Sequence, residues 1–416
     1  MIHLRDISAD VRQYLVVTGN YWGFTLTDGA LRMLVVLHFH SLGYSPLQIA
    51  LLFLFYEFFG IVTNLVGGWL GARLGLNKTM NLGLACQIIA LSMLLVPAVW
   101  LTVPWVMAAQ ALSGIAKDLN KMSAKSSIKL LVPGNQQGRL YHWVALLTGS
   151  KNALKGVGFF MGGALLAWIG FRGAAGAMAL ALALVFVLSL RLLSQDLGRA
   201  KNKPRFSRLF SKSPAINTLS AARLFLFGAR DVWFVVALPV FLSQILGWPP
   251  LQVGGFMALW VIGYGMVQSQ APRLTGGRSG RVPGRNAVIS WALGLAVIPA
   301  GIAIGLMTME NVTTILVGGL LVFGVLFAVN SSLHSYLIVS FADADGVSLD
   351  VGFYYMANAA GRLLGTVLSG VLYQAYGLQM CLWVSAGFVA LAAVISVWLP
   401  QTSLNEGEHS PATPDR

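Results

Sequence analysis

The sequence is dominated by long apolar segments of about 20 residues, each able to cross the roughly 30 Å hydrocarbon core of a bilayer as a helix. With 56% apolar residues, 10% charged residues and a mean hydropathy of +0.73, the chain is excluded from the ordinary soluble class. We therefore predict an all-α membrane protein that crosses the lipid bilayer twelve times. The predicted spans are residues 14–39, 46–70, 78–101, 104–131, 140–169, 173–193, 216–241, 250–271, 286–307, 312–341, 347–376 and 379–399.

Basic residues between the spans indicate how the chain is oriented. Loops on one side contain Arg73, Lys78 and Arg139, a basic run over 191–212 and further arginines over 273–285, whereas the other side has little beyond Arg172. The positive-inside rule then predicts that both termini and the central loop are cytoplasmic. The apolar stretch that starts near Tyr14 is too long for a signal peptide, so we expect it to be a retained transmembrane helix.

Several function classes lack their usual sequence signals. The chain has no H-E-x-x-H, no P-loop and no dense group of Asp, Glu and His, and Cys86 and Cys381 are isolated in apolar runs. We therefore expect a membrane transporter rather than an enzyme, with no catalytic residue, metal site or cofactor. The net charge of +14 lies largely in the loops, and we interpret the basic central loop as a topology determinant and linker without a nucleic-acid partner.

An internal repeat divides the chain into two halves. Residues 42–49, LGYSPLQI, recur as LGWPPLQV at 246–253, a separation of 204 positions. At a separation of 207, Gly158, Gly163 and Gly170 match Gly365, Gly370 and Gly377. We expect two pseudo-symmetric six-helix bundles, 1–190 and 216–400, a basic linker over 191–215 and a polar tail over 401–416. Such halves suit alternating access around a midplane site and argue against a channel.

Cationic side chains inside the spans predict a polar cavity. Each would cost roughly 2.5 to 3.5 kcal/mol at the bilayer centre on insertion scales, so they must avoid lipid. Four carboxylates at similar depth, Asp28, Glu57, Asp118 and Asp231, are too few to neutralise them. The surplus favours a multivalent anion as the guest of the cavity. The eight cations are Arg32, Lys117, Lys121, Lys151, Lys155, Arg223, Arg230 and Arg362.

Lysines in the fourth span recur at every fourth residue and so share one face of a helix. We expect Lys117 and Lys121, the deeper pair, to line the cavity. Lys125 and Lys129 lie nearer the cytoplasmic end and are interpreted as snorkelling topology residues. Asp118 points elsewhere on this helix, where a neighbouring span could supply its partner.

Lysines also occur four residues apart in the fifth span, at 151 and 155. Lys155 matches Arg362 in the repeat, so the two are predicted to bind the anion from equivalent places in both halves. The alternative for each is neutralisation by an internal carboxylate. The glycines that follow are expected to allow close helix packing rather than to contact ligand: Gly156, Gly158, Gly162 and Gly163.

Arg32 and Arg230 are further candidate substrate-binding residues, because a guanidinium presents a planar fork to phosphate or arsenate oxygens. For both, a structural salt bridge is the alternative, and Arg223 is left undecided. Five residues are candidates for coupling or counter-ion roles, with counter-ions favoured for the carboxylates: Asp28, Glu57, Asp118, Asp231 and His334. His334 could equally be a packing residue. Candidate cavity-lining residues are Asn330, Tyr354, Tyr355 and Asn358.

The twelve spans, the basic central loop and the repeat resemble the major facilitator superfamily. The segment 68–78, GWLGARLGLNK, is similar to that superfamily's motif G-x-L-x-D-R-x-G-R-K. It departs from the motif at Ala72, which replaces the acidic residue, and at Leu76 and Asn77, which replace a basic pair. The resemblance implies the major facilitator fold, without the motif's usual charged gating contacts.

A narrower resemblance is carried by segments 20–32, 114–125, 148–156 and 228–233, which are similar to ArsJ-type organoarsenical efflux permeases. It implies export of 1-arseno-3-phosphoglycerate from the bacterial inner membrane, arsenate resistance, and a functional link to glyceraldehyde-3-phosphate dehydrogenase, which forms that compound from arsenate. First-helix arginines in both halves also resemble the organophosphate:phosphate antiporters. An organophosphate/phosphate exchanger or another organic anion transporter is therefore the alternative, with a proton or an exchanged anion as coupling ion.

Overall fold

Helices joined by short connections make up the described part of the computed structural model, and no strand occurs in it. The first half of the chain contains α1 (Ala9–Ser41), α3 (Leu54–Leu74), α4 (Leu76–Met93), the 3-10 helix η2 (Ala98–Trp100), α5 (Val103–Leu131) and α6 (Gln137–Leu192). The second half contains α7 (Pro214–Phe234), α8 (Ala237–Gln244), α9 (Pro250–Leu274), α10 (Arg285–Thr308), α11 (Val312–Phe341) and α12 (Val347–Ser396). The described residues are 9–44, 52–132, 136–193, 197–199, 213–276, 283–308 and 310–401.

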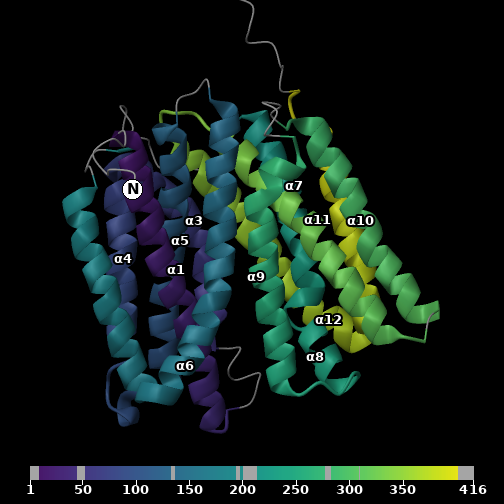
Figure 1. The fold of residues 1–416 in the computed structure, drawn as a ribbon, viewed down its shortest axis with the longest axis horizontal. Helices are drawn as coiled ribbons and strands as arrows, with labels where there is room; N and C mark the ends of the chain where they lie inside the picture. The colour runs from purple at the N-terminus through teal and green to yellow at the C-terminus, as the bar shows by residue number, and fades with distance from the viewer. Residues whose placement is uncertain are drawn as a thin grey trace, which may run out of the picture.

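These helices run side by side in two groups, so that the described segments make twelve passes (Figure 1). We call the side on which α1 begins and α12 ends the terminus face. The predicted all-α fold with twelve spans is confirmed, and most boundaries agree within a few residues. The start of the predicted second span, 46–51, lies outside the described residues. The third span ends earlier than expected, since α4 stops at Met93 and Pro97 precedes the separate helix η2.

Side-chain caps mark the starts of α7 and α11. The side chain of Ser213 accepts a hydrogen bond of 3.3 Å from the amide of Ile216 at the start of α7, where Pro214 occupies the first helical position. Asn311 does the same for α11, with the amide of Thr314 at 3.2 Å. The sequence thus marks where these two crossings begin.

Matched glycines confirm the internal repeat. Gly170 in α6 has φ 71° and ψ 177°, and Gly377 in α12 has φ 76° and ψ −174°. Each lies where one crossing turns into the next, so α6 and α12 are both pairs of crossings. Gly43 and Gly247, which occupy equivalent places in the other repeated segment, also have positive φ values of 87° and 67°. The two halves therefore turn the chain with the same device at the same positions.

Close packing within each half also repeats. A Cβ atom on Gly158 would lie 2.7 Å from the carbonyl oxygen of Leu26 in α1. A Cβ atom on its counterpart Gly365 would lie 2.6 Å from the carbonyl oxygen of Gly228 in α7. These approaches are closer than any side chain allows, so the expectation of close helix packing at Gly158 is confirmed.

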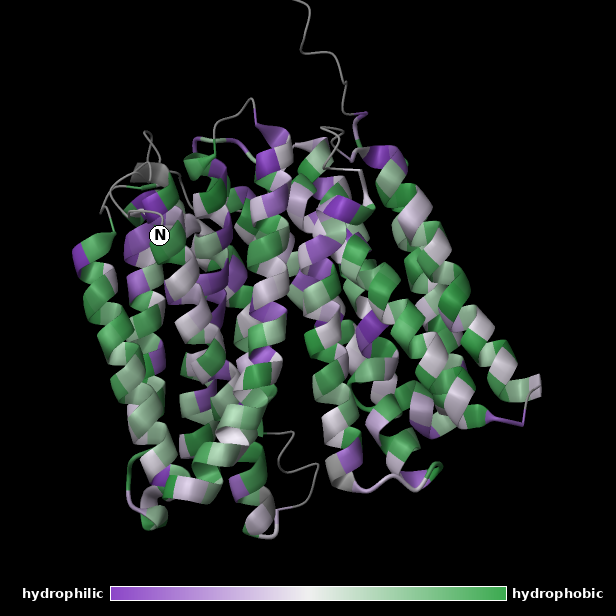
Figure 2. Ribbon diagram, viewed as in Figure 1, coloured by the Kyte–Doolittle hydropathy of each residue, from purple (hydrophilic) through white to green (hydrophobic). Residues whose placement is uncertain are grey.

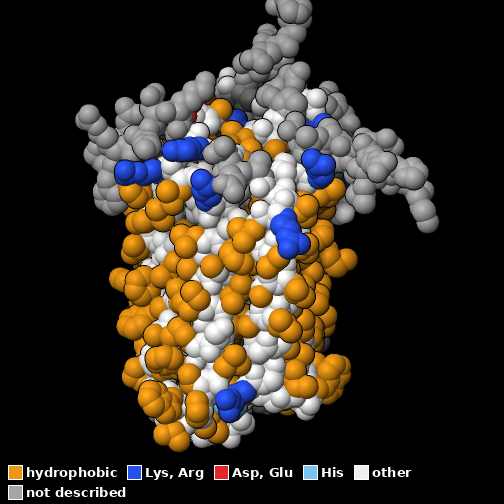
Figure 3. Space-filling model, turned by 90° about the vertical axis from the view of Figure 1, so that its left-hand side faces the viewer, with side chains coloured by type: hydrophobic (Ala, Val, Ile, Leu, Met, Phe, Trp, Pro, Cys, Tyr) orange, Lys and Arg blue, Asp and Glu red, His pale blue; other side chains and the backbone are white. Residues whose placement is uncertain are grey.

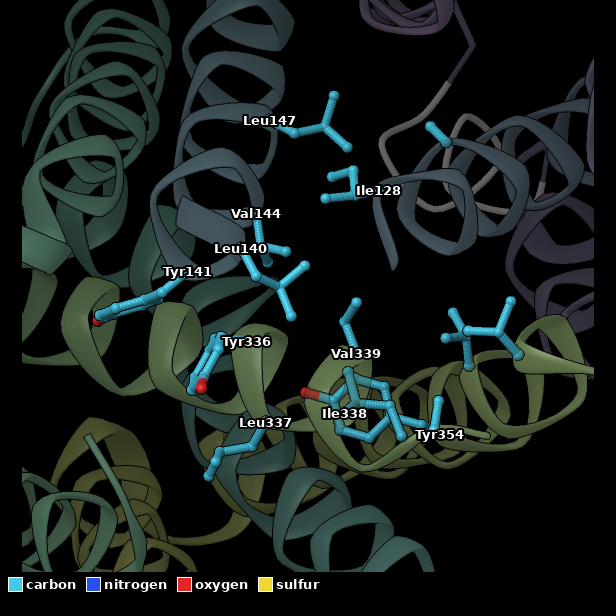
Figure 4. Close-up of a cluster of buried hydrophobic side chains, with 14 of the residues drawn as sticks. Ile128, Leu140, Tyr141, Val144, Leu147, Tyr336, Leu337, Ile338, Val339 and Tyr354 are labelled. Atoms are coloured by element: carbon cyan, nitrogen blue, oxygen red, sulfur yellow. The ribbon is translucent and has the colours of Figure 1, made fainter. Parts of the chain in front are cut away.

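A cluster of buried apolar side chains joins the two halves near the terminus face. Figure 4 shows Leu140 and Val144 of α6 opposite Tyr336 and Val339 of α11. The rings of Tyr141 and Tyr336 lie 4.9 Å apart, centroid to centroid. Two other apolar clusters lie within single halves.

Backbones of the two halves also touch near this face. A Cβ atom on Gly68 of α3 would lie 2.4 Å from the carbonyl oxygen of Ser348 at the start of α12, and the Ser348 hydroxyl donates to the carbonyl oxygen of Gly68 at 2.7 Å. Hydrogen bonds between described residues of the two halves near this face include those of Gln137 with Tyr336 and Ser340, and that of Lys129 with Ser340. The halves are therefore closed toward the terminus face.

The outer surface suits a bilayer. Figure 3 shows hydrophobic side chains along most of the height of one side, with Lys and Arg gathered mainly toward its upper end. In Figure 2 the helices are predominantly hydrophobic, and hydrophilic segments are interspersed along the central ones. By length and composition, five described helical segments qualify as membrane spans, and two of them, α6 and α12, contain two crossings each.

We predict that Gly377→Ala lowers the free energy of unfolding by about 1 to 3 kcal/mol, because its backbone lies in a region that only glycine adopts readily. Gly370→Ala is the control: it adds a methyl group in a helix of the same crossing, where nothing lies within 4 Å. Thermal unfolding of the purified variants in detergent measures the difference. Equal melting temperatures for the two variants would contradict the strain argument.

Candidate functional site

Glu57 gathers cations from three helices. Its carboxylate lies 3.1 Å from the Arg32 guanidinium of α1, 3.2 Å from that of Arg362 in α12 and 3.9 Å from the Lys117 ammonium of α5. Arg362 belongs to the second half of the chain, whereas Arg32 and Lys117 belong to the first. The ion pairs of Glu57 therefore bridge the two halves near the middle of the crossings.

Two buried carboxylates extend this cluster. Asp118 lies 2.5 Å from Lys121 and 3.8 Å from Lys117, and Asp231 lies 2.5 Å from Arg230 and 3.1 Å from Arg362. Asp118 therefore pairs with lysines of its own helix, rather than with the neighbouring span that we expected to supply its partner.

Together these ion pairs form one continuous network, which we call the Glu57 network. It contains five cations and three carboxylates, a formal surplus of two positive charges (5 − 3 = 2). Five of the seven predicted substrate-binding residues lie in it, and Lys151 and Lys155 do not. Its members are Arg32, Lys117, Lys121, Arg230, Arg362, Glu57, Asp118 and Asp231.

Tyr56 contacts network residues that belong to the first half of the chain. Its ring contacts two cations, with the Arg32 guanidinium 4.7 Å and the Lys117 ammonium 3.8 Å from the ring centroid. Its hydroxyl donates to the carboxylate of Asp28 at 2.6 Å. Asp28 thus has a tyrosine partner, and Arg32 pairs with Glu57 although Asp28 is one turn away on α1. The sequence contained no signal for Tyr56 beyond its place next to Glu57.

Lys151 and Lys155 stand apart from carboxylates. The Lys151 ammonium donates to the side-chain oxygen of Asn152 at 3.2 Å, and Asn152 donates to Gln268 of α9 at 2.6 Å. Lys155 has neither a hydrogen bond nor an ion pair with another described residue. A neutral amide pair therefore links α6 to α9 beside two cations that no carboxylate contacts among the described residues. We did not anticipate Gln268.

Arg223 is held inside the second half. Its guanidinium donates to Asn358 at 2.9 Å and to the carbonyl oxygen of Ser331 at 3.2 Å, and it lies 3.8 Å from the ring centroid of Phe227. These contacts tie α7 to α11 and α12. Of the two roles left open for Arg223, this geometry favours the structural one, and it gives Asn358 an arginine as partner.

The lysines of α5 nearest the terminus face contact other residues: Lys125 is buried and Lys129 is partly buried. Lys125 is buried and donates to the Thr148 hydroxyl at 2.6 Å, so the expectation of a snorkelling side chain is wrong for it. Lys129 donates to the carbonyl oxygen of Ser340 in the other half at 2.8 Å. The Lys121 and Lys125 ammonium groups lie 4.6 and 5.2 Å from the ring centroid of Tyr355. These lysines contribute to the closed contact between halves.

The remaining candidate residues lie deep in the second half. Asn330 donates to the carbonyl oxygens of Trp291 and Leu326, both at 2.9 Å, and so ties α11 to α10. His334 and Tyr354 are buried as well. In this conformation none of the three is open to a ligand.

Two apolar grooves, of about 450 and 380 Å³, lie away from the Glu57 network and contain none of its residues. The first is formed by α3 and α5 and includes Phe55, Phe59 and Met107; the second is lined by residues such as Phe241 and Tyr373. Within the described part of the chain, no group of three or more His, Cys, Asp or Glu side chains could hold a metal ion. The candidate site is therefore the charged region between the halves.

Comparison with known families decides the assignment. The sequence profile of the Major Facilitator Superfamily matches residues 14–345 and again 224–415. The chain belongs to the major facilitator superfamily. It is accordingly a multi-pass membrane transporter and not an enzyme, as the sequence predicted. A search of curated proteins found no significant match.

Solved structures of the superfamily share this fold. The human organic anion transporter MFSD10 (TETRAN) superposes with a TM-score of 0.73 at 17% identity, covering 94% of this chain and 100% of that one. A bacterial homologue of the iron transporter ferroportin, in an outward-facing state, gives 0.71 at 16% identity, covering 94% and 99%. The proton:xylose symporter XylE gives 0.73 at 13% identity, covering 94% and 97%. At such identities the likeness extends to the fold alone.

We predict that Asp231→Asn lowers the free energy of unfolding by about 3 kcal/mol, because it leaves Arg230 and Arg362 without their buried counter-ion. Unfolding in mixed micelles by a denaturing detergent measures the change. Asp343→Asn, which removes an exposed carboxylate after α11, is the control and is expected to change little.

The double variant Asp231→Asn with Arg230→Gln should recover part of the lost stability, since it removes the cation that Asp231→Asn leaves without an ion pair, whereas Arg362 keeps Glu57. If Asp231→Asn is no less stable than Asp343→Asn, the two arginines do not depend on this carboxylate.

Proposed function

We propose that this transporter binds an organic polyanion between its two halves and exports it. The observation that carries the proposal is the charge balance of the site: the Glu57 network has five cations and three carboxylates, and Lys151 and Lys155 add two cations. Uncompensated charge in a membrane interior is expensive, so an anionic guest stabilises this region. A neutral or cationic substrate would leave the surplus in place.

Phosphate-like groups suit the residue types that surround the site. Arg32 and Arg362 present guanidinium forks, which bind two oxygens of a carboxylate, phosphate or arsenate at once. Lys117, Lys151 and Lys155 add compact charges that tolerate several oxygen positions. The site is therefore suited to a molecule with more than one ionised oxyanion group.

Resemblance to the ArsJ-type permeases supports 1-arseno-3-phosphoglycerate as that molecule, because it bears an acyl arsenate at one end and a phosphate at the other. Its export followed by breakdown would confer arsenate resistance, with glyceraldehyde-3-phosphate dehydrogenase as its source. The residues themselves support the coarser class of phosphate-like polyanions. Arg32, Lys117, Lys121, Lys151, Lys155, Arg230 and Arg362 are the proposed binding residues.

Carboxylates of the site act as counter-ions in this proposal. Glu57 contacts three cations, and Asp118 and Asp231 contact two each, so all three are placed to act as counter-ions. We expect transport by rocking of the two halves, 1–190 against 216–400, around the charged region. The described conformation would load or release its substrate on the side opposite the terminus face.

We predict that Lys155→Ala and Arg362→Ala each slow the uptake of 3-phosphoglycerate and of 1-arseno-3-phosphoglycerate into inverted membrane vesicles roughly tenfold or more, since each removes a charged contact to the anion. Cells that depend on these variants should lose arsenate resistance. Arg172→Ala is the control, because Arg172 is exposed and donates to the carbonyl oxygen of Leu95 at the opposite end of the molecule.

Normal resistance and uptake with well-expressed Lys155→Ala and Arg362→Ala would contradict the proposed site. Accumulation of 3-phosphoglycerate without its arsenate analogue would instead favour the organophosphate exchanger.

We further propose that the terminus face is cytoplasmic in a bacterial inner membrane, on the strength of the basic loops that meet there. An alkaline phosphatase fused after Gln401 should then be inactive, and one inserted at Pro97, in the connection between α4 and η2, should be active. The reverse pattern of activities would place the termini outside the cell and invert the proposed direction of opening.

A further inference from the structure

Glu57 differs from the other two carboxylates of its network in accessibility. Its side chain is 31% exposed, whereas those of Asp118 and Asp231 are 1% and 0% exposed. Arg32 and Arg362, which bind it, are 28% and 29% exposed. The centre of the network is thus accessible to solvent, although its two ends are enclosed.

The two oxygens of Glu57 have different partners. Oε1 lies 3.1 Å from Arg32 and 3.2 Å from Arg362, one guanidinium from each half, whereas Oε2 lies 3.9 Å from Lys117. An oxyanion held by two arginine forks and a lysine is the arrangement expected of a bound substrate group. Arg32 also has a buried Nε with no hydrogen-bond partner among the described residues, so its fork has an unused donor.

We propose that Glu57 is a resident anion: in the empty transporter its carboxylate occupies the position that a carboxylate, phosphate or arsenate group of the substrate takes when bound. This inference rests on the proposed anion transport and names the place where one anionic group binds, between Arg32 and Arg362. Substrate must displace the carboxylate to bind there. Glu57 retains Lys117 as its partner when displaced, since that contact uses the other oxygen and lies within the first half.

Displacement has two consequences for transport. Competition from an attached carboxylate weakens the apparent affinity for substrate, because part of the binding free energy is spent on breaking the Arg32 and Arg362 pairs. In the empty transporter, the Glu57 carboxylate also reduces the electrostatic repulsion between cations of one half and cations of the other. Glu57 therefore lets the empty halves approach each other as the loaded halves do.

The test measures binding and flux in the full chain reconstituted in lipid, with 3-phosphoglycerate and inorganic phosphate as probes. Glu57→Gln keeps the shape of the side chain and removes its charge. We expect the dissociation constant for 3-phosphoglycerate to fall about tenfold, because the competing charge is gone. Exchange of labelled for unlabelled 3-phosphoglycerate should persist, whereas net flux, which requires return of the empty transporter, should slow. Asp343→Asn is the control for removal of one negative charge and should change neither.

The results of this test distinguish a failure of the resident-anion inference from a failure of the proposed anion transport. If the unmodified protein binds neither probe nor the arsenate analogue, the proposed anion transport is wrong. If it binds 3-phosphoglycerate and Glu57→Gln binds it no more tightly, the resident-anion inference is overturned while the proposed function stands. If Glu57 served only to hold the two halves together, Glu57→Gln would bind 3-phosphoglycerate more weakly and also exchange it more slowly, and the inference would again be overturned.

A measurement on the unmodified protein covers the case in which Glu57→Gln fails to fold. Glu57 is the only one of the chain's four glutamates inside a predicted span, the others being Glu310, Glu406 and Glu408. With glutamate labelled by carbon-13, infrared difference spectra should show a shift of one carboxylate stretch when 3-phosphoglycerate is added. Binding without any shift would overturn the inference.

Discussion

The cost of charge in a membrane interior governs the arrangement of this molecule. A lone Arg or Lys at the bilayer centre costs several kcal/mol, so the intramembrane cations must turn inward and find partners. Asp118 and Asp231 are buried beside two cations each, and Glu57 shares one cation with each of them and adds Arg32 at the contact between halves. These pairings join side chains of α1, α3, α5, α7 and α12. The polar interior and the apolar exterior are thus two results of one constraint.

Contacts of two different kinds join the halves. Toward the terminus face they are apolar and close: Gly68 meets the backbone of Ser348, and the Tyr141 ring packs against Tyr336. At the level of Glu57 the contact is ionic and half exposed. Close apolar packing is stabilised by each atomic contact and excludes water from this end of the interface. In a solvent-accessible ion pair, by contrast, either partner can be replaced by another ion of the same charge.

Much of the fold could be predicted from the sequence, because span length and the repeat are local or periodic signals. Gly170 and Gly377 were matched by spacing alone, and both adopt the same left-handed backbone. The cations of the site were predicted for a similar reason, because a charged residue within an apolar segment can be identified from the sequence alone. Their partners were not predictable. Asp118 pairs along its own helix, Tyr56 contacts two cations, and Arg223 turns into its own half, because helix rotation and tertiary packing decide these contacts.

The amide pair of Asn152 and Gln268 adds a property that charged contacts lack. It joins α6 to α9 across the two halves at 2.6 Å and carries no net charge. Membrane voltage does no work on such a bond, and neither ionic strength nor the valence of a passing solute alters its strength appreciably. The contact between the halves therefore contains an uncharged joint at Asn152 and Gln268 as well as a charged one at Glu57.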